Sequence, residues 1–124
     1  MFNNFLSSIK VVLISIFLVF NMSILQAKHH ECDIIIKNKD FQSGTLSRKS
    51  EQECIFTLKS GVKHKIRICN KDSLPMEFES HDLRREKVIK ANKSALISLP
   101  VLKKGKKYNF FEEFYGKQCF FEAS

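Results

Sequence analysis

Residues 76–79, Met-Glu-Phe-Glu, lie within the stretch NKDSLPMEFESHDLRREKV (70–88) and alternate apolar with acidic side chains. An alternation with a period of two predicts a β-strand with Met76 and Phe78 on one face and Glu77 and Glu79 on the other. Two carboxylates on one face of a strand lie about 6–7 Å apart, close enough to share a divalent cation with help from other groups. The stretch holds five acidic side chains and a histidine in a lysine-rich chain. Function is therefore expected here.

Short strand-like runs recur on both sides of this strand at roughly ten-residue spacing, with turn signals such as Ser60-Gly61 and Lys104-Gly105 between them. No segment shows a long apolar period of 3.6 residues. Many short strands with regular turns predict an all-β sandwich or small barrel. The runs are 33–37, 54–58, 65–69, 77–79, 87–90, 95–99, 108–111 and 119–122, and the core is expected to contain Phe56, Phe78, Phe110 and Phe120.

The first 27 residues are typical of a secretory signal peptide. Val11–Phe20 is an apolar run that contains a single serine, Ser15, and Ala27 precedes the charged Lys28-His29-His30-Glu31. We expect cleavage after Ala27, a single domain at residues 28–124 and a periplasmic location. The alternative is an uncleaved membrane anchor, although the apolar run is well short of the roughly 20 residues that a spanning helix needs.

All four cysteines, Cys32, Cys54, Cys69 and Cys119, follow the predicted cleavage site. In an oxidising compartment an even number of cysteines suggests up to two disulfides, and three pairings remain open. The alternative is a set of buried free thiols. No Cys-x-x-Cys motif is present, so neither a thioredoxin-like redox site nor a zinc knuckle is indicated.

The chain is basic, with a formal net charge of +8, and cleavage would remove one lysine and no acidic residue. Because export is expected and no basic helix is present, nucleic acid is not an expected partner. The densest basic run, 103–107 (Lys-Lys-Gly-Lys-Lys), surrounds a glycine and is predicted to form a turn. This turn is either a solvated hairpin tip or a weak contact for an anionic membrane surface or an acidic protein.

From residue 58 onward the order of the motifs resembles a known family. LKSGVKHKIRICNKD (58–72) is followed by LPMEFESHDLRREKVI (74–89), by SLPVLKKGKKYNFFEEFY (98–115) and by a closing strand. These segments resemble the cupredoxin-like domains of periplasmic bacterial iron-uptake proteins, the EfeO-type domains associated with high-affinity iron permeases. The resemblance implies a Greek-key β-sandwich of about eight strands, a role in oxidising, holding or delivering iron or copper, and an inner-membrane iron permease as a partner.

The resemblance also implies metal ligands, because the acidic positions of that family fall on Glu77, Glu79, Glu86 and Glu113. Carboxylates with an optional imidazole suit iron, Cu(II) and hard cations generally. Nearby in the sequence are His81, Asp82 and Met76, which add an imidazole, a carboxylate and a thioether.

One residue departs from the family pattern. The aromatic strand of the family commonly ends Glu-Phe-His, whereas this chain has Glu113-Phe114-Tyr115, and a phenol is a poorer ligand than an imidazole. The alternative interpretation is a solvated carboxylate face in which Glu86 pairs with a neighbouring arginine or lysine and Met76 belongs to the core.

A conventional type 1 blue copper site is not expected. Such a site needs a cysteine near the C-terminus followed within a few residues by a histidine and then a weak axial methionine. Cys119 is followed only by Phe-Phe-Glu-Ala-Ser.

A second metal site depends on the cleavage point. If Ala27 is the last leader residue, the mature chain begins Lys28-His29-His30. A free amine, two deprotonated amides and the imidazole of His30 then form a square-planar set that suits Cu(II) or Ni(II). The alternative is a frayed and functionally silent terminus.

No motif for nucleophilic catalysis or phosphate binding is present. The sequence therefore predicts an exported metal-binding accessory protein, and ferroxidase activity is left open. The rival interpretation is a β-sandwich adaptor of the cell envelope that has lost its metal ligands, which Tyr115 in place of a histidine favours.

Overall fold

The computed structural model describes residues 31–124, in which β-strands are joined by turns and loops. This part of the chain contains no helix that is long and apolar enough to cross a membrane. The predicted signal peptide, its membrane-anchor alternative and His30 lie outside the described residues. The strands are β1 (Ile34–Lys37), β2 (Asp40–Ser43), β3 (Ile55–Leu58), β4 (His64–Asn70), β5 (Met76–Ser80), β6 (Arg85–Ile89), β7 (Ser94–Leu99), β8 (Lys107–Glu112) and β9 (Lys117–Ala123).

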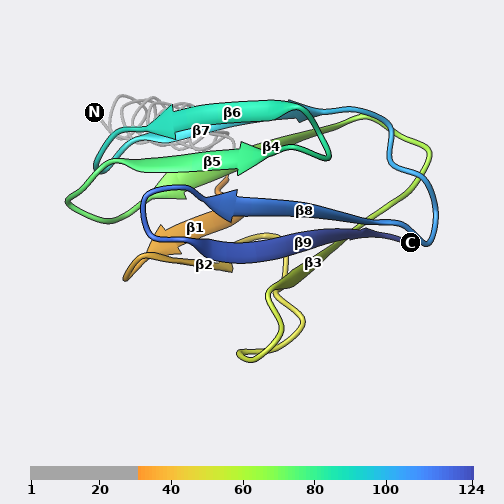
Figure 1. Cartoon of the computed structure of the whole chain (residues 1–124), viewed down its shortest axis with the longest axis horizontal. Helices are drawn as coiled ribbons and strands as arrows, with labels where there is room; N and C mark the ends of the chain where they lie inside the picture. Colours follow the sequence, from red (N-terminus) through yellow and green to blue (C-terminus); the bar gives the residue numbers. More distant parts are fainter. Residues whose placement is uncertain (1–30) are drawn as a thin grey trace, which may run out of the picture. The chain divides into compact units, whose positions relative to one another are not determined.

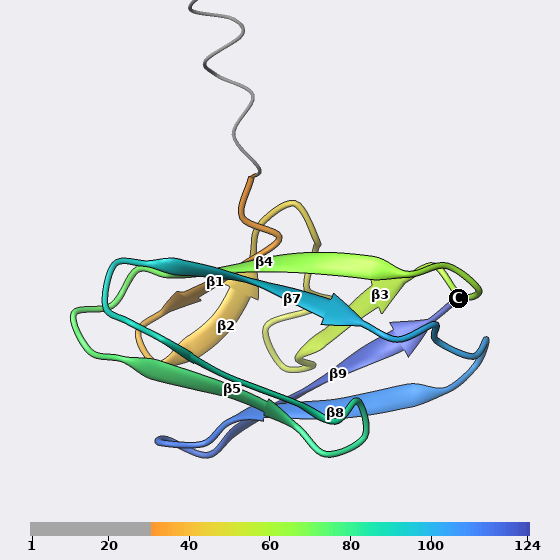
Figure 2. The ribbon, with the colours of Figure 1, turned by 90° about the horizontal axis from the view of Figure 1, so that it is seen from above.

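The strands form two sheets packed face to face (Figures 1 and 2). One sheet has the order β2-β1-β4-β7 and the other has the order β3-β9-β8-β5-β6. The pairs β1–β4 and β3–β9 are parallel and the remaining pairs are antiparallel. The predicted all-β sandwich is confirmed, with nine strands instead of about eight. The chain crosses repeatedly between the sheets, which makes neighbours of segments that are distant in sequence.

The additional strand is β2, which the sequence analysis did not predict. A tight hairpin joins β1 to β2 through Asn38 and Lys39, with φ angles of 53° and 61°. The carboxylate of Asp72 accepts hydrogen bonds from both backbone nitrogens, at 2.9 Å each. A two-residue turn with positive φ usually contains glycine, so this turn depends on a carboxylate supplied by a distant loop.

Phenylalanine rings fill the space between the sheets. Phe56, Phe78 and Phe110 are fully buried, as predicted, and the ring of Phe110 stacks on that of Phe121 at 4.4 Å between centroids. The prediction for Phe120 is wrong, because this residue is half-buried on the outer face of β9. Cys119 faces inward, so the alternation of the strand places Phe121 in the core and Phe120 outside.

The four cysteines form two disulfides, Cys32–Cys69 and Cys54–Cys119. This result selects one of the three pairings that the sequence left open and excludes free thiols. The bonds connect residues 37 and 65 positions apart. Closing loops of this size stabilises a small domain by about 2–4 kcal/mol per bond.

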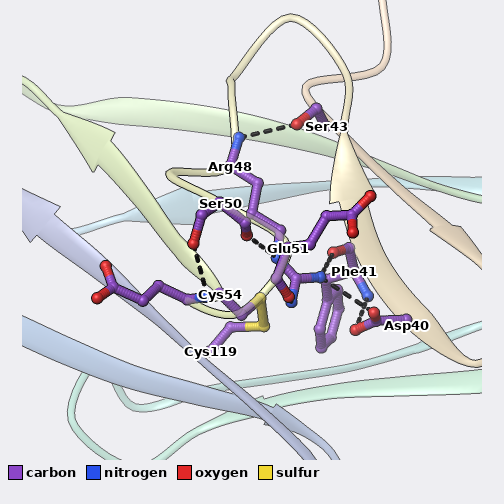
Figure 3. Close-up of a disulfide and its surroundings, with 9 residues drawn as sticks. Asp40, Phe41, Ser43, Arg48, Ser50, Glu51, Cys54 and Cys119 are labelled. Carbon is purple, nitrogen blue, oxygen red and sulfur yellow. Dashed lines mark hydrogen bonds and ion pairs between the residues drawn. A yellow bond between two sulfur atoms is a disulfide. The ribbon is translucent and has the colours of Figure 1, made fainter.

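An arginine fastens the long β2–β3 loop beside the Cys54–Cys119 disulfide (Figure 3). The guanidinium of Arg48 donates to the Asp40 carboxylate at 3.0 Å and to the Phe41 carbonyl at 2.9 Å. It also donates to the carbonyls of Ser50 and Glu51, at 2.9 and 2.8 Å. Nearly the whole donor capacity of Arg48 is therefore used to hold the loop against β2.

Candidate metal centre

Strand β5 positions the first two carboxylates. The predicted alternation is confirmed, since Met76 and Phe78 are buried in the core while Glu77 and Glu79 lie on the opposite face of the strand. Glu77 nevertheless keeps only 8% of its surface exposed. The residue is therefore largely covered by its neighbours, although it does not belong to the apolar core.

The turn after β8 brings a third carboxylate, Glu113, to the same place. The backbone nitrogen of Glu113 donates to the Glu77 carbonyl at 3.1 Å. The turn is shaped by the fully buried carboxylate of Glu112, which accepts hydrogen bonds from the backbone nitrogens of Glu77 and Phe114 at 3.0 Å each. The backbone nitrogen of Tyr115 donates to the same carboxylate. Glu112 is thus a positioning residue that joins the turn to the beginning of β5.

The result is a group of four glutamates, which we call the carboxylate cluster: Glu77, Glu79, Glu86 and Glu113. One carboxylate oxygen from each of Glu77, Glu79 and Glu113 lies within 4.8 Å of the other two. Glu86 lies on β6 directly opposite Glu79 and forms a side-chain hydrogen bond with Glu77. The structure therefore brings together all four glutamates that the sequence analysis selected.

The electrostatics of the cluster favour uptake of a cation or a proton. The hydrogen bond with Glu86 raises the pKa of Glu77 to about 7, with burial and then repulsion from Glu86, Glu113 and Glu112 as further causes. Between residues 31 and 124, no lysine or arginine forms an ion pair with the cluster. The alternative in which Glu86 pairs with a neighbouring basic residue is therefore not observed.

The other predicted ligands differ in their access to the cluster. His81 is at its edge, with Nε2 3.6 Å from Glu79 Oε1 and a side chain that is 78% exposed. The carboxylate of Asp82 is occupied elsewhere, since it accepts a hydrogen bond from the Asn109 nitrogen at 2.8 Å. Met76 is 1% exposed and lies in the core on the other side of β5. His81 is thus the one additional ligand of these three that faces the cluster.

Tyr115 occupies the position where the resembling family commonly has histidine. Its ring lies beneath the ammonium group of Lys39, 4.7 Å from the ring centroid. Together with Met76 it lines a cavity of about 350 Å³ at this end of the sandwich. The β8–β9 turn therefore supplies one carboxylate to the cluster, and its tyrosine makes a cation–π contact instead.

The donor set does not fit a type 1 copper centre. That centre requires a cysteine thiolate. The sulfur atoms of all four cysteines are bound in the two disulfides, so no thiolate is available. The arrangement of oxygen atoms with an optional imidazole instead suits Cu(II), ferrous or ferric iron, or a hard divalent cation.

Comparison with known protein families agrees with this architecture. The model of the cupredoxin-like domain family matches residues 10–120. The chain belongs to the cupredoxin-like domain family. Such a domain fits a metal-binding or electron-transfer protein, and copper is the metal that it typically binds.

A curated protein that is similar to part of this chain has a name that states no function. An uncharacterized protein of Rickettsia prowazekii (strain Madrid E) is 41% identical to this cupredoxin-like chain over 61 residues. The match covers 49% of this chain and 48% of that protein, so it spans about half of each.

The two disulfides of this cupredoxin-like domain are consistent with an extracellular or periplasmic location.

Proposed function

We propose that this protein is an exported cupredoxin-like protein that binds iron or copper at the carboxylate cluster and assists the oxidation or delivery of iron during uptake. One observation carries the proposal: three carboxylates from β5 and the β8–β9 turn lie within 4.8 Å of one another. Within the described residues, no lysine or arginine balances them. Carboxylates this close together repel one another, and a bound proton or cation relieves the repulsion.

The chemistry of the cluster favours an ion of high charge. Anionic oxygen donors stabilise Fe(III) relative to Fe(II), because hard ligands interact more strongly with the higher charge. Binding would displace the proton that Glu77 retains near neutral pH, so metal uptake should release protons. His81, at the edge of the cluster, could add one imidazole nitrogen after a rotation of its exposed side chain.

The test is a calorimetric titration of tag-free protein with Cu(II) and, without oxygen, with Fe(II). Combining Glu77→Ala with Glu86→Ala should weaken binding by at least about 100-fold, since loss of even an outer-shell partner typically costs 10–100-fold. The matched control combines Glu51→Ala with Glu53→Ala, which removes the same charge from exposed loop positions. Unchanged affinity in the first variant would reject the proposed site.

Oxygen consumption distinguishes a ferroxidase from a stoichiometric carrier. In ferroxidase turnover, four Fe(II) ions each lose one electron, and O₂ takes up these electrons with four protons to form two water molecules. A ferroxidase would consume oxygen continuously with excess Fe(II). With a carrier, oxygen consumption would end once the iron-binding site of each protein molecule is filled. We propose the carrier as the simpler function.

The location and the partner are also part of the proposal. The signal-peptide pattern of residues 1–27 and the two disulfides support export to the periplasm. We propose an inner-membrane iron permease as the recipient of the metal, on the resemblance of residues 55–122 to iron-uptake domains. The intact mass of the exported protein should correspond to a chain that begins at Lys28 and contains two disulfides.

A second candidate is an adaptor that has the sandwich but binds no metal. The tyrosine at position 115 favours it, because the ring is engaged by Lys39 where a ligand histidine is common in the resembling family. Metal content distinguishes the candidates. An adaptor purified without an affinity tag would contain no bound transition metal and would not take one up in the titration.

A further inference from the structure

Two loops that are distant in sequence meet at one end of the sandwich. The β3–β4 loop (59–63) and the β7–β8 loop (100–106) lie together near the C-terminus in both views (Figures 1 and 2). The nitrogen of Gly61 donates to the carbonyl of Leu102 at 3.0 Å, and the nitrogen of Gly105 donates to that of Ala123 at 2.9 Å. These bonds fix the two loops to each other and to β9, so their side chains form one surface.

This surface is strongly basic, and we call its exposed lysines the lysine pole: Lys59, Lys63, Lys65, Lys103, Lys104, Lys106 and Lys107. The segments that carry them, 59–65 and 99–107, contain no acidic residue. None of these lysines forms an ion pair with a carboxylate in the described residues. The predicted turn of residues 103–107 is thus part of a larger cationic surface.

The pole also presents apolar side chains and a hollow. Val62 and Val101, one from each loop, are 40% and 50% exposed. Val101 also lines a cavity of about 670 Å³, together with Lys63, Lys65 and Arg85. Lysine side chains around two separate exposed valines match the interface of a lipid bilayer, where the lipid phosphates lie above the acyl chains.

We propose that the lysine pole docks on the surface of an anionic lipid bilayer. The lysines bind lipid phosphates, and Val62 and Val101 insert between the headgroups. A lipid surface fits better than an acidic protein, because the two exposed valines are single side chains on separate loops and do not form the continuous apolar core of a specific protein interface. One lysine near an anionic membrane contributes an affinity of about fivefold.

Docking in this orientation leaves the carboxylate cluster accessible. Strand β8 begins at Lys107 in the lysine pole and ends at Glu112, directly before Glu113 of the cluster. The two sites therefore lie toward opposite ends of the same strand. Membrane docking does not depend on metal binding, so either proposal can fail while the other stands.

The test is sedimentation of the exported protein with vesicles. We expect binding to vesicles of phosphatidylcholine with phosphatidylglycerol, no binding to phosphatidylcholine alone, and loss of binding as salt is raised. Combining Lys103→Glu with Lys104→Glu should weaken binding by at least about 25-fold, from the contribution of two lysines. The matched control, Lys90→Glu with Lys93→Glu, makes the same charge change in the β6–β7 turn and should retain most of the affinity.

The apolar contribution is tested separately. Combining Val62→Ser with Val101→Ser should weaken binding several-fold without changing its salt dependence, whereas Val88→Ser, at a comparably exposed position on β6, should have no effect. Equal binding to both kinds of vesicle, or equal loss in the two lysine variants, would overturn the proposal. Binding to soluble polyglutamate without binding to vesicles would also overturn it and would identify an acidic protein as the partner.

Discussion

The contacts of Arg48 with β2 and the β2–β3 loop and the carboxylate cluster both involve charged side chains, but their charges are balanced in different ways. Arg48 is surrounded by the Asp40 carboxylate and three backbone carbonyls, which satisfy its guanidinium. The cluster contains only acidic side chains, and the hydrogen bond with Glu86, burial and repulsion from the neighbouring glutamates raise the pKa of Glu77. The fold balances the charge of Arg48 internally, whereas no lysine or arginine within residues 31–124 forms an ion pair with the carboxylate cluster.

Arg48→Ala should have the largest effect on stability. It leaves the partly buried Asp40 carboxylate and several carbonyls without their donor, which should cost about 3 kcal/mol. For a domain of this size the melting temperature should fall by roughly 10–20 °C, as measured by circular dichroism. Lys49→Ala is the control, because this exposed lysine forms only a surface pair with Glu53. Equal effects of the two substitutions would contradict the structural role of Arg48.

Glu77→Gln should stabilise the metal-free protein at alkaline pH. The folded-state pKa of Glu77 is about 7, above its ordinary value of 4.5, so the folded state binds this proton more tightly than the unfolded chain does. The contribution of Glu77 to stability is therefore greatest below pH 4.5 and is lost as the pH rises toward and through 7.

The glutamine variant should thus melt a few degrees higher than the wild type at about pH 8 and show little difference at about pH 4, where Glu77 is protonated. Thermal melts in the presence of a chelator provide the measurement. Glu51→Gln, at an exposed loop position, serves as the control and should leave the pH profile unchanged. If the melting temperature of the glutamine variant followed that of the wild type at every pH, Glu77 would not retain a proton near neutral pH.

His81→Ala should have the smallest effect. The imidazole is exposed and lies 3.6 Å from Glu79, so it is an optional ligand of the cluster. We expect the affinity for Cu(II) to fall by only several-fold and the melting temperature of the metal-free protein to remain unchanged. A loss as large as that of the Glu77→Ala and Glu86→Ala combination would make His81 a principal ligand and would require a different geometry.

The sequence predicted the parts of the site that depend on local pattern. The alternation of residues 76–79 was enough to place Glu77 and Glu79 on one face of β5, because side-chain direction in a strand follows the residue number. The placement of Glu86 and Glu113 came from the family resemblance. Which strands are neighbours in a sheet depends on crossovers that local pattern does not encode.

Other features depended on tertiary contacts and were missed. Glu112 shares the inward face of Phe110, a signal that could have indicated a buried carboxylate, but its three backbone partners become apparent only in the fold. Strand β2 depends on Asp72, which stabilises a turn far away in the sequence. In β9 the sequence analysis selected the wrong one of two adjacent phenylalanines, because the inward-facing Cys119 places Phe121 in the core and Phe120 outside.

The backbone bond from Glu113 to Glu77 has a consequence for folding. The carboxylates it brings together belong to segments that meet only after β5 and β8 have paired, so an unfolded chain presents no comparable chelate. An ion that binds this geometry would bind the native state and not the unfolded chain. The free energy of unfolding would then increase with the concentration of the ion. Occupancy by metal would then report that the two segments have assembled correctly.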